Sequence, residues 1–243
     1  MTKYIVFRYF VYRWHVALAV FINAQSEVVM DKRNIIIFGD SYSTFAGCIP
    51  QGYAPYYTGT GERVPDIASA DESWWGLLMN ETGWKLVRND SWSGAPICYR
   101  GYNGTDVSKS CSFIYRLKKL REEGYFAENE IDTVLVLGGT NDSWCGAEIG
   151  EEKREGWERE DLYSVLPAVW YYFTDLRATF PKAQIYTICN CDINEKIIDA
   201  MVRASESVGA VPVLLHDIDK LEGHPTKQGM MEIKEQVLAT MLK

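Results

Sequence analysis

A run of four apolar residues, Ile35 to Phe38, ends abruptly at Gly39-Asp40-Ser41 and constrains the fold more than any other stretch of the sequence. The run is β-branched and aromatic without alternation, the pattern of a parallel strand buried on both faces. A glycine at its end allows a sharp turn, and the polar residues that follow lie at the carboxyl edge of the strand, where open α/β sheets bind ligands. Ser41 is therefore the candidate nucleophile.

Four further apolar runs alternate with amphipathic segments along the chain. Strands are predicted over 84–88, 131–137, 183–189 and 211–215, and helices over 72–81, 113–124, 161–180, 194–208 and from 226 onward. Asp71 is expected to N-cap the first of these helices. Five strands alternating with helices give right-handed crossovers and a parallel sheet covered on both faces. The predicted fold is a three-layer α/β/α sandwich in a single domain.

Charge and composition exclude several classes of function. A net charge of -8 and scattered basic residues disfavour nucleic acid as a partner. The sequence has no Walker-type phosphate loop and no dinucleotide glycine fingerprint, so no cofactor is predicted. The six cysteines lack a framework spacing, which predicts free thiols in a reducing compartment. Cys189, Cys191 and His216 could gather at one strand edge, but three ligands without a fourth are a weak zinc signal, and no metal site is predicted.

The N-terminal residues 1–29 fit a folded domain poorly. The apolar run from Val16 to Ile22 is too short to span a bilayer, and Ile22-Asn23-Ala24 is a poor small-residue cleavage site. We expect a leader or a translated upstream extension outside the fold, a single folded domain over residues 30–243, and a cytoplasmic protein. The alternative is a signal peptide and a secreted protein. Secretion would predict a mature start after Ala24, which the intact mass of the native protein would reveal.

Polar motifs follow three of the predicted strands and precede the last helix. They are Gly39-Asp40-Ser41, Gly94, Gly138-Gly139-Thr140-Asn141-Asp142 and His224-Pro225. Because the carboxyl ends of parallel strands share one edge of a sheet, these motifs can form a single site. Ester hydrolysis needs a nucleophile, a base and donors for the oxyanion. Among the three histidines, His15 lies in the N-terminal extension and His216 at a strand end, so His224 is the better-placed base.

The order and rough spacing of the four motifs resemble those of the SGNH/GDSL hydrolases over about residues 33 to 243. The resemblance implies a flavodoxin-like sheet with strand order 2-1-3-4-5 and a serine esterase mechanism. It also implies that Ser41 attacks the acyl carbon and that His224 acts as general base and then as general acid. The Ser41 N–H, the Gly94 N–H and the Asn141 side-chain amide would form the oxyanion hole. Asp40 and Asp142 are expected to bind backbone groups rather than to act in catalysis.

The sequence departs from the family pattern just before the histidine. The family usually places an aspartate three residues ahead of it, where this sequence has Leu221. Asp219 could supply the carboxylate from a rearranged loop, and Glu222 is a further candidate. Alternatively, the Leu221 carbonyl could accept the imidazole N–H and leave a Ser-His dyad.

Aromatic residues surround these motifs. Tyr42, Trp92, Trp144 and the tyrosines of the 46–70 loop lie in or beside them, and flat rings suit stacking on sugars or packing on acyl chains. The predicted function is hydrolysis of small acyl esters such as carbohydrate O-acetyl esters, with a small-molecule ester as the partner and no membrane span. The alternatives are a lipase- or thioesterase-type acylhydrolase and a catalytically silent binding module, the latter because the aspartate is missing.

Overall fold

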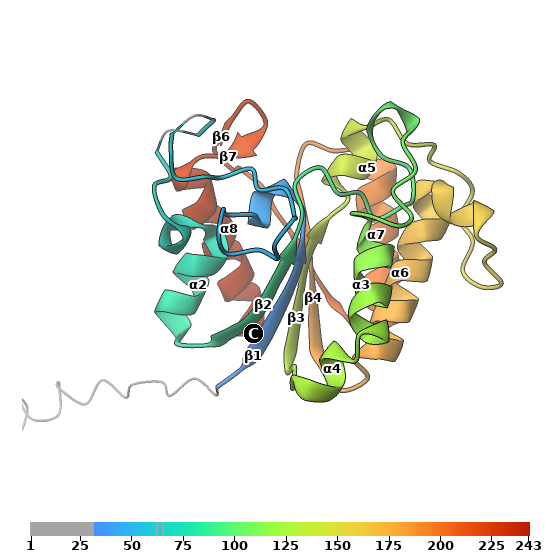
Figure 1. Ribbon diagram of the computed structural model, residues 1–243, viewed down its shortest axis with the longest axis horizontal. Helices are drawn as coiled ribbons and strands as arrows, with labels where there is room; N and C mark the ends of the chain where they lie inside the picture. The colour runs from blue at the N-terminus through green and yellow to red at the C-terminus, as the bar shows by residue number, and fades with distance from the viewer. Residues whose placement is uncertain (1–31, 62, 65) are drawn as a thin grey trace, which may run out of the picture. The chain divides into compact units, whose positions relative to one another are not determined.

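The structure is a computed structural model that describes residues 32–61, 63–64 and 66–243 (Figure 1). The predictions about residues 1–29 concern a segment outside this described part of the chain. Within it, no helix is long and apolar enough to cross a membrane.

A parallel sheet of five strands in the order β2-β1-β3-β4-β5 forms the centre of the described domain. The strands are β1 (Asn34–Gly39), β2 (Lys85–Ser91), β3 (Thr133–Gly138), β4 (Gln184–Cys189) and β5 (Val211–Leu214). Gly39 pairs with Ser91 on one side and with Leu137 on the other, so the carboxyl ends of the three strands are level. The predicted fold class and strand order are confirmed.

Helices cover both faces of the sheet. They are α2 (Trp74–Thr82), α3 (Phe113–Glu122), α6 (Val165–Thr179), α7 (Glu195–Ser207) and α8 (Lys227–Met241). Figure 1 shows α2 and α8 against one face and α3, α6 and α7 against the other. The side chains of β1 from Ile35 to Phe38 are fully buried, which explains why that run is apolar without alternation.

Short elements complete the domain. They are the 3-10 helices η1 (Ser41–Ser43), η2 (Ala70–Glu72), η3 (Tyr102–Gly104) and η4 (Glu160–Tyr163), the helices α4 (Tyr125–Glu128) and α5 (Thr140–Trp144), and the strands β6 (Lys220–Leu221) and β7 (His224–Pro225). The strands β6 and β7 form an antiparallel hairpin. The sequence did not predict α4, α5 or the hairpin, because elements of two to five residues are too short to show a periodic pattern.

Two helix starts differ from the predictions. Ser73 caps α2 in place of Asp71, with its hydroxyl accepting a hydrogen bond from the Gly76 N–H at 3.0 Å. Asp71 instead lies within η2, which forms a separate turn before the cap. Similarly, η4 occupies the region where α6 was expected to begin, and α6 starts only at Val165. In both places a polar segment forms a 3-10 turn before the apolar helical stripe begins.

A buried arginine on α3 joins the ends of the two strands nearest the nucleophile. Arg116 is 0% exposed, and its guanidinium donates hydrogen bonds to the Gly39 carbonyl at 3.1 Å and to the main-chain carbonyl of Asp90. It also pairs with the Asp90 carboxylate at 3.2 Å, and its Nε donates to the Cys111 carbonyl at 2.8 Å. Arg116 therefore fixes the end of β1 immediately before the turn that carries Ser41.

Candidate active site

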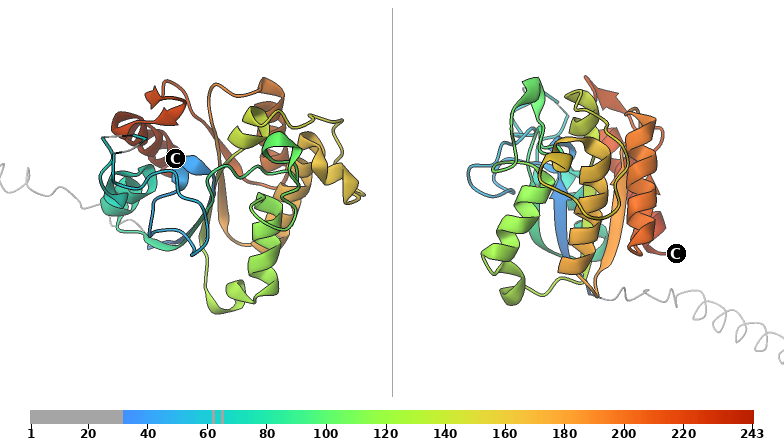
Figure 2. Two further views of the ribbon diagram at one scale, coloured as in Figure 1. Left: turned by 45° about the horizontal axis from the view of Figure 1, so that its top comes forward. Right: turned by 90° about the vertical axis from the view of Figure 1, so that its right-hand side faces the viewer.

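Ser41 lies at the carboxyl edge of the sheet, where β1 turns sharply into η1. The turn needs glycine at position 39, because a Cβ there would overlap the Ser91 hydroxyl and lie 2.6 Å from the Ser43 Cβ. The left panel of Figure 2 turns this edge of the sheet toward the viewer. The serine is buried, with only 3% of its surface exposed.

Asp40 holds the turn through the main chain. Its buried carboxylate accepts a hydrogen bond from the Tyr42 N–H at 3.0 Å. Burial raises the pKa of Asp40 to about 7, although this hydrogen bond opposes the shift. The contact agrees with the prediction that Asp40 bonds a backbone group.

His224 lies against the serine although the two residues are far apart in the sequence. Its Nε2 is 3.0 Å from the Ser41 hydroxyl oxygen, and its Nδ1 is 3.3 Å from the Glu222 carbonyl oxygen. Burial lowers the pKa of His224 from 6.5 to about 4; the hydrogen bond to Glu222 opposes this shift, and the charges of Arg63 and Lys220 add to it. The imidazole is therefore neutral, and able to accept a proton, at neutral pH.

The structure does not bring the Asp219 carboxylate to His224. That carboxylate accepts a hydrogen bond from the Thr226 hydroxyl at the start of α8. The main-chain acceptor for the ring also differs from the one predicted, since it belongs to Glu222 rather than to Leu221. The reason is the tight β6–β7 turn, in which Glu222 has a φ of 49° and Gly223 a φ of 80°. This turn folds the Glu222 carbonyl back onto the ring two residues later.

The three predicted oxyanion donors lie at the same sheet edge. Neither the Ser41 N–H nor the Gly94 N–H has an acceptor among the residues that the structure describes. Gly94 has a φ of 82°, a left-handed conformation that favours glycine. Both N–H groups are thus available to a ligand.

The amide of Asn141 is buried and oriented by two contacts. Its Nδ2 donates to the Ala95 carbonyl at 3.1 Å, and its Oδ1 accepts from the Tyr102 hydroxyl at 2.9 Å. The second N–H of Nδ2 has no partner in the described part of the chain. The bond to Ala95 places Asn141 beside the Gly94 turn. Sequence reasoning missed Tyr102, because it begins the three-residue helix η3, which is too short to show a pattern and has no motif around it.

Asp142 ties α5 to the loop that follows Gly94. Its carboxylate accepts the N–H groups of Ile97 at 2.8 Å and Cys98 at 3.0 Å. Burial raises the pKa of Asp142, and these two hydrogen bonds oppose the shift. The contacts agree with the predicted structural use of this carboxylate.

The suggested metal ligands do not gather. The Cys191 thiol lies 3.3 Å from Lys220 Nζ, and the His216 ring pairs with Asp217. Within the described ranges, no three His, Cys, Asp or Glu side chains are arranged to hold a metal ion.

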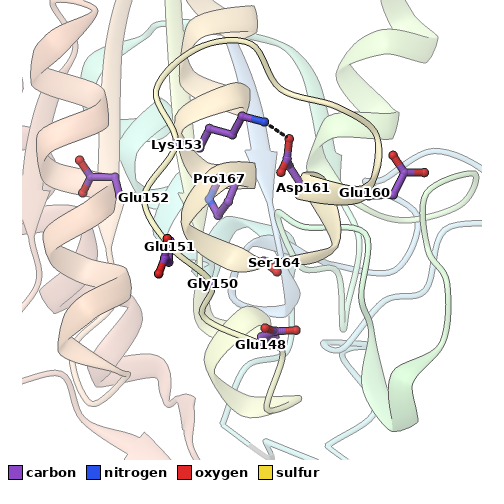
Figure 3. A pocket seen from close by; sticks show the side chains of 9 residues that line it. All are labelled: Glu148, Gly150, Glu151, Glu152, Lys153, Glu160, Asp161, Ser164 and Pro167. Atoms are coloured by element: carbon purple, nitrogen blue, oxygen red, sulfur yellow. Dashed lines mark hydrogen bonds and ion pairs between the residues drawn. The ribbon is translucent and has the colours of Figure 1, made fainter.

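A hollow of about 510 Å³ lies elsewhere on the surface, beside the loop that leads into α6 (Figure 3). Its side chains are mostly acidic, and Lys153 pairs with Asp161 within it at 2.5 Å. None of the predicted catalytic residues lines this hollow. It therefore adds nothing to the site at Ser41.

A family comparison and a comparison with solved structures both find GDSL-like lipases similar to this chain. The sequence matches the family described as GDSL-like lipase/acylhydrolase over residues 33–241. A protein from Bacteroides ovatus described as a GDSL-like lipase is 35% identical, with a TM-score of 0.80 over 87% of this chain and 98% of that one. A second protein described as a GDSL-like lipase, from Bacteroides uniformis, is 38% identical. Its TM-score is 0.80 over 87% of this chain and 96% of that one.

A more distant likeness concerns the fold alone. An acetyl xylan esterase from the rumen bacterium Butyrivibrio proteoclasticus is 17% identical, with a TM-score of 0.54 over 85% of this chain and 62% of that one. No curated protein matches the sequence.

Proposed function

The chain belongs to the GDSL-like lipase/acylhydrolase family and is an ester-cleaving hydrolase, and from this premise we propose that Ser41 and His224 form its catalytic dyad. The observation that carries the proposal is the 3.0 Å contact between the Ser41 hydroxyl oxygen and His224 Nε2. In the proposed reaction, the serine oxygen attacks the acyl carbon while Nε2 takes its proton, and the imidazolium then protonates the leaving alcohol. Water repeats these steps on the acyl-enzyme and releases the acid.

The contact at Nδ1 supports the tautomer that this mechanism needs. A carbonyl oxygen can only accept a hydrogen bond, so the contact with Glu222 favours a proton on Nδ1 and a free lone pair on Nε2. That lone pair faces the serine hydroxyl. A main-chain carbonyl thus takes the orienting role that a carboxylate has in a Ser-His-Asp triad.

The negative charge of the tetrahedral intermediate would be stabilised by three donors. These are the N–H groups of Ser41 and Gly94 and the second N–H of the Asn141 amide. Because Ala95 and Tyr102 fix the amide before substrate arrives, little reorganisation is needed when the charge develops.

Replacing Asn141 by alanine is expected to lower kcat by about 100- to 1,000-fold with little change in KM, the usual cost of losing one oxyanion donor. Steady-state kinetics on a p-nitrophenyl ester would measure both constants. Asn129→Ala is the control, since that amide only binds the Tyr125 carbonyl at the end of α4. An unchanged kcat in correctly folded Asn141→Ala would remove this residue from the mechanism.

Replacing Asp219 by asparagine is expected to keep kcat/KM within about tenfold of the wild type, because the main-chain acceptor of His224 survives the change. Glu222→Gln should behave in the same way, since only the carbonyl of that residue faces the ring. A loss near 10⁴-fold for Asp219→Asn, the size seen when a triad aspartate is replaced, would restore the carboxylate as the orienting group.

For the substrate, we propose small acyl esters of carbohydrates. Two large aromatic side chains contact candidate site residues and remain exposed, Trp144 at 38% and Tyr102 at 42%. The Trp144 ring lies 5.5 Å from the His224 ring, and the Tyr102 hydroxyl is bonded to the proposed oxyanion donor Asn141. Flat rings at the rim of a polar site suit the faces of sugar rings.

Two measurements test this proposal. A fluorophosphonate probe should label the wild type and Ser207→Ala, a control for a remote helix hydroxyl, but not Ser41→Ala. In turnover assays, acetylated oligosaccharides should be hydrolysed with a higher kcat/KM than long-chain acyl esters. Preference for long chains would favour a lipase instead. A folded protein that neither labels nor cleaves any short ester would leave only a binding role.

A further inference from the structure

His224 has only one polar contact at Nδ1, and that contact is long. The 3.3 Å separation from the Glu222 carbonyl oxygen lies at the weak end of hydrogen-bond distances. A single weak bond allows the ring to rock about it, yet the proposed mechanism needs Nε2 held against the serine hydroxyl. Other groups must therefore restrain this residue.

Three tyrosines near the nucleophile contact the hairpin that carries His224. The rings of Tyr56 and His224 are stacked, with centroids 3.5 Å apart and planes 7° apart. The Tyr42 ring lies 5.6 Å from the imidazole at an angle of 53°. These contacts restrict the rotation of the imidazole.

Two of the tyrosine hydroxyls also fix the backbone on either side of the histidine. The Tyr42 hydroxyl donates to the Gly223 carbonyl at 2.5 Å, and the Tyr57 hydroxyl donates to the Pro225 carbonyl at 2.9 Å. Both tyrosines are buried, at 0% and 3% exposure, so these hydrogen bonds are shielded from water.

Tyr42 and Tyr56 are also anchored on the segment that carries the nucleophile. Tyr42 follows Ser41 directly, and its N–H is bound by Asp40. The Tyr56 N–H donates to the Thr44 hydroxyl at 2.8 Å, and that hydroxyl donates to the Ser41 carbonyl at 3.0 Å. A chain of short contacts thus runs from the serine through the tyrosines to the histidine.

We propose that Tyr42, Tyr56 and Tyr57, here called the tyrosine cradle, are positioning residues that hold His224 against Ser41 in place of a triad carboxylate. This inference rests on the proposed dyad. The two hydroxyls set the place of the backbone, the stacked ring sets the plane of the imidazole, and the Glu222 carbonyl sets the tautomer.

The first test removes the two hydroxyls while keeping the rings. Tyr42→Phe and Tyr57→Phe should each lower kcat about tenfold, and the double variant about 100-fold, with KM nearly unchanged, since small misplacements of reacting groups cost about this much. Tyr172→Phe is the matched control, because Tyr172 is fully buried on α6 and its hydroxyl has no partner among the described residues. It should retain wild-type kcat.

The second test removes the stacked ring and follows the histidine itself. Burial keeps the pKa of His224 near 4; the titratable and charged side chains facing it include Tyr42, Tyr56, Arg63 and Lys220, and the Trp144 ring also packs against it. Tyr56→Leu uncovers the ring, so the His224 pKa should rise toward 6.5 and the acid limb of kcat/KM should move to higher pH. Tyr56→Phe keeps the stack and should leave both unchanged. Histidine resonances in a ¹⁵N NMR titration report this pKa without any need for activity.

The outcomes separate the cradle from the dyad. If the Tyr42→Phe/Tyr57→Phe protein and Tyr56→Leu both match Tyr172→Phe in kcat, and the His224 pKa does not move, the cradle is overturned even though Ser41→Ala is inactive. If Ser41→Ala keeps full activity, the dyad fails instead. Should Tyr56→Leu not fold, the phenylalanine variants decide alone, because they keep the packing of the rings.

Discussion

Replacement of His224 by alanine is expected to reduce kcat/KM for ester hydrolysis by about 10⁴- to 10⁶-fold, the range found when a catalytic histidine of a serine hydrolase is lost. Among the residues that the structure describes, no other side chain is placed to act as the base for Ser41. The only other histidine in the described residues, His216, pairs with Asp217 and has a side chain 73% exposed. Asp40, although close in sequence, is fully buried and bound to the Tyr42 N–H.

The kinetic pattern of combined variants gives a sharper check. Ser41→Ala/His224→Ala should be no less active than either single variant, because residues that act as a unit have strongly non-additive effects. His216→Ala should keep wild-type kcat/KM and serves as the control. Substantial activity in folded His224→Ala, or additive losses in the double variant, would contradict the dyad.

The second large effect concerns stability. Arg116→Ala is expected to lower the free energy of unfolding by about 3–5 kcal/mol, because it removes one of the two cationic partners of a buried carboxylate. The Asp90 carboxylate is fully buried and would keep only Arg88, at 2.8 Å. Urea denaturation monitored by circular dichroism measures the change. The Gly39 carbonyl would lose one of its two donors and keep only the Trp92 N–H at 3.1 Å, so kcat should fall as the turn at Ser41 loosens.

The same helix offers a matched control for that prediction. Arg121→Ala removes a pair with Asp175 at the surface, and such pairs contribute only about 0.2–1 kcal/mol. Adding Asp90→Asn to Arg116→Met should recover part of the stability, since the unpaired charge is then gone. If Arg116→Ala proves as stable as Arg121→Ala, the buried ion pair does not hold these strand ends together.

Much of the site followed from the sequence because one geometric rule governs it. Parallel strands place their carboxyl ends at one edge, so the residues after β1 and β3 could be assigned to a common site before any contact was known. The structure brings Ser41 to His224 at 3.0 Å and leaves the Gly94 N–H open beside Asn141. Ser41, Asn141 and His224 could be recognised in the sequence because their side chains carry the chemistry, and Gly94 because its turn favours glycine.

Two features of the site could not be predicted because no residue type or motif in the sequence indicates them. The acceptor for His224 is a main-chain carbonyl, and every residue has one, so only the φ angles of Glu222 and Gly223 decide which carbonyl faces the ring. Arg116 lies on the buried stripe of α3, three residues after Phe113, but an arginine is expected at the surface unless its partners are known. Tertiary contacts settle both features, and local patterns do not encode them.

The Glu222 carbonyl also changes which mutations the enzyme can tolerate. A side-chain acceptor is lost by a single codon change, whereas no substitution deletes a carbonyl, so a point mutation can disturb the orienting group of the proposed dyad only through the backbone, for example at the left-handed Gly223. The position of this carbonyl depends instead on the number of residues in the β6–β7 turn. Inserting or deleting one residue in the turn between β6 and β7 would replace the Glu222 carbonyl with a different group at the ring. Variation in this hairpin is therefore expected to proceed by exchange of residues and not by gain or loss of them.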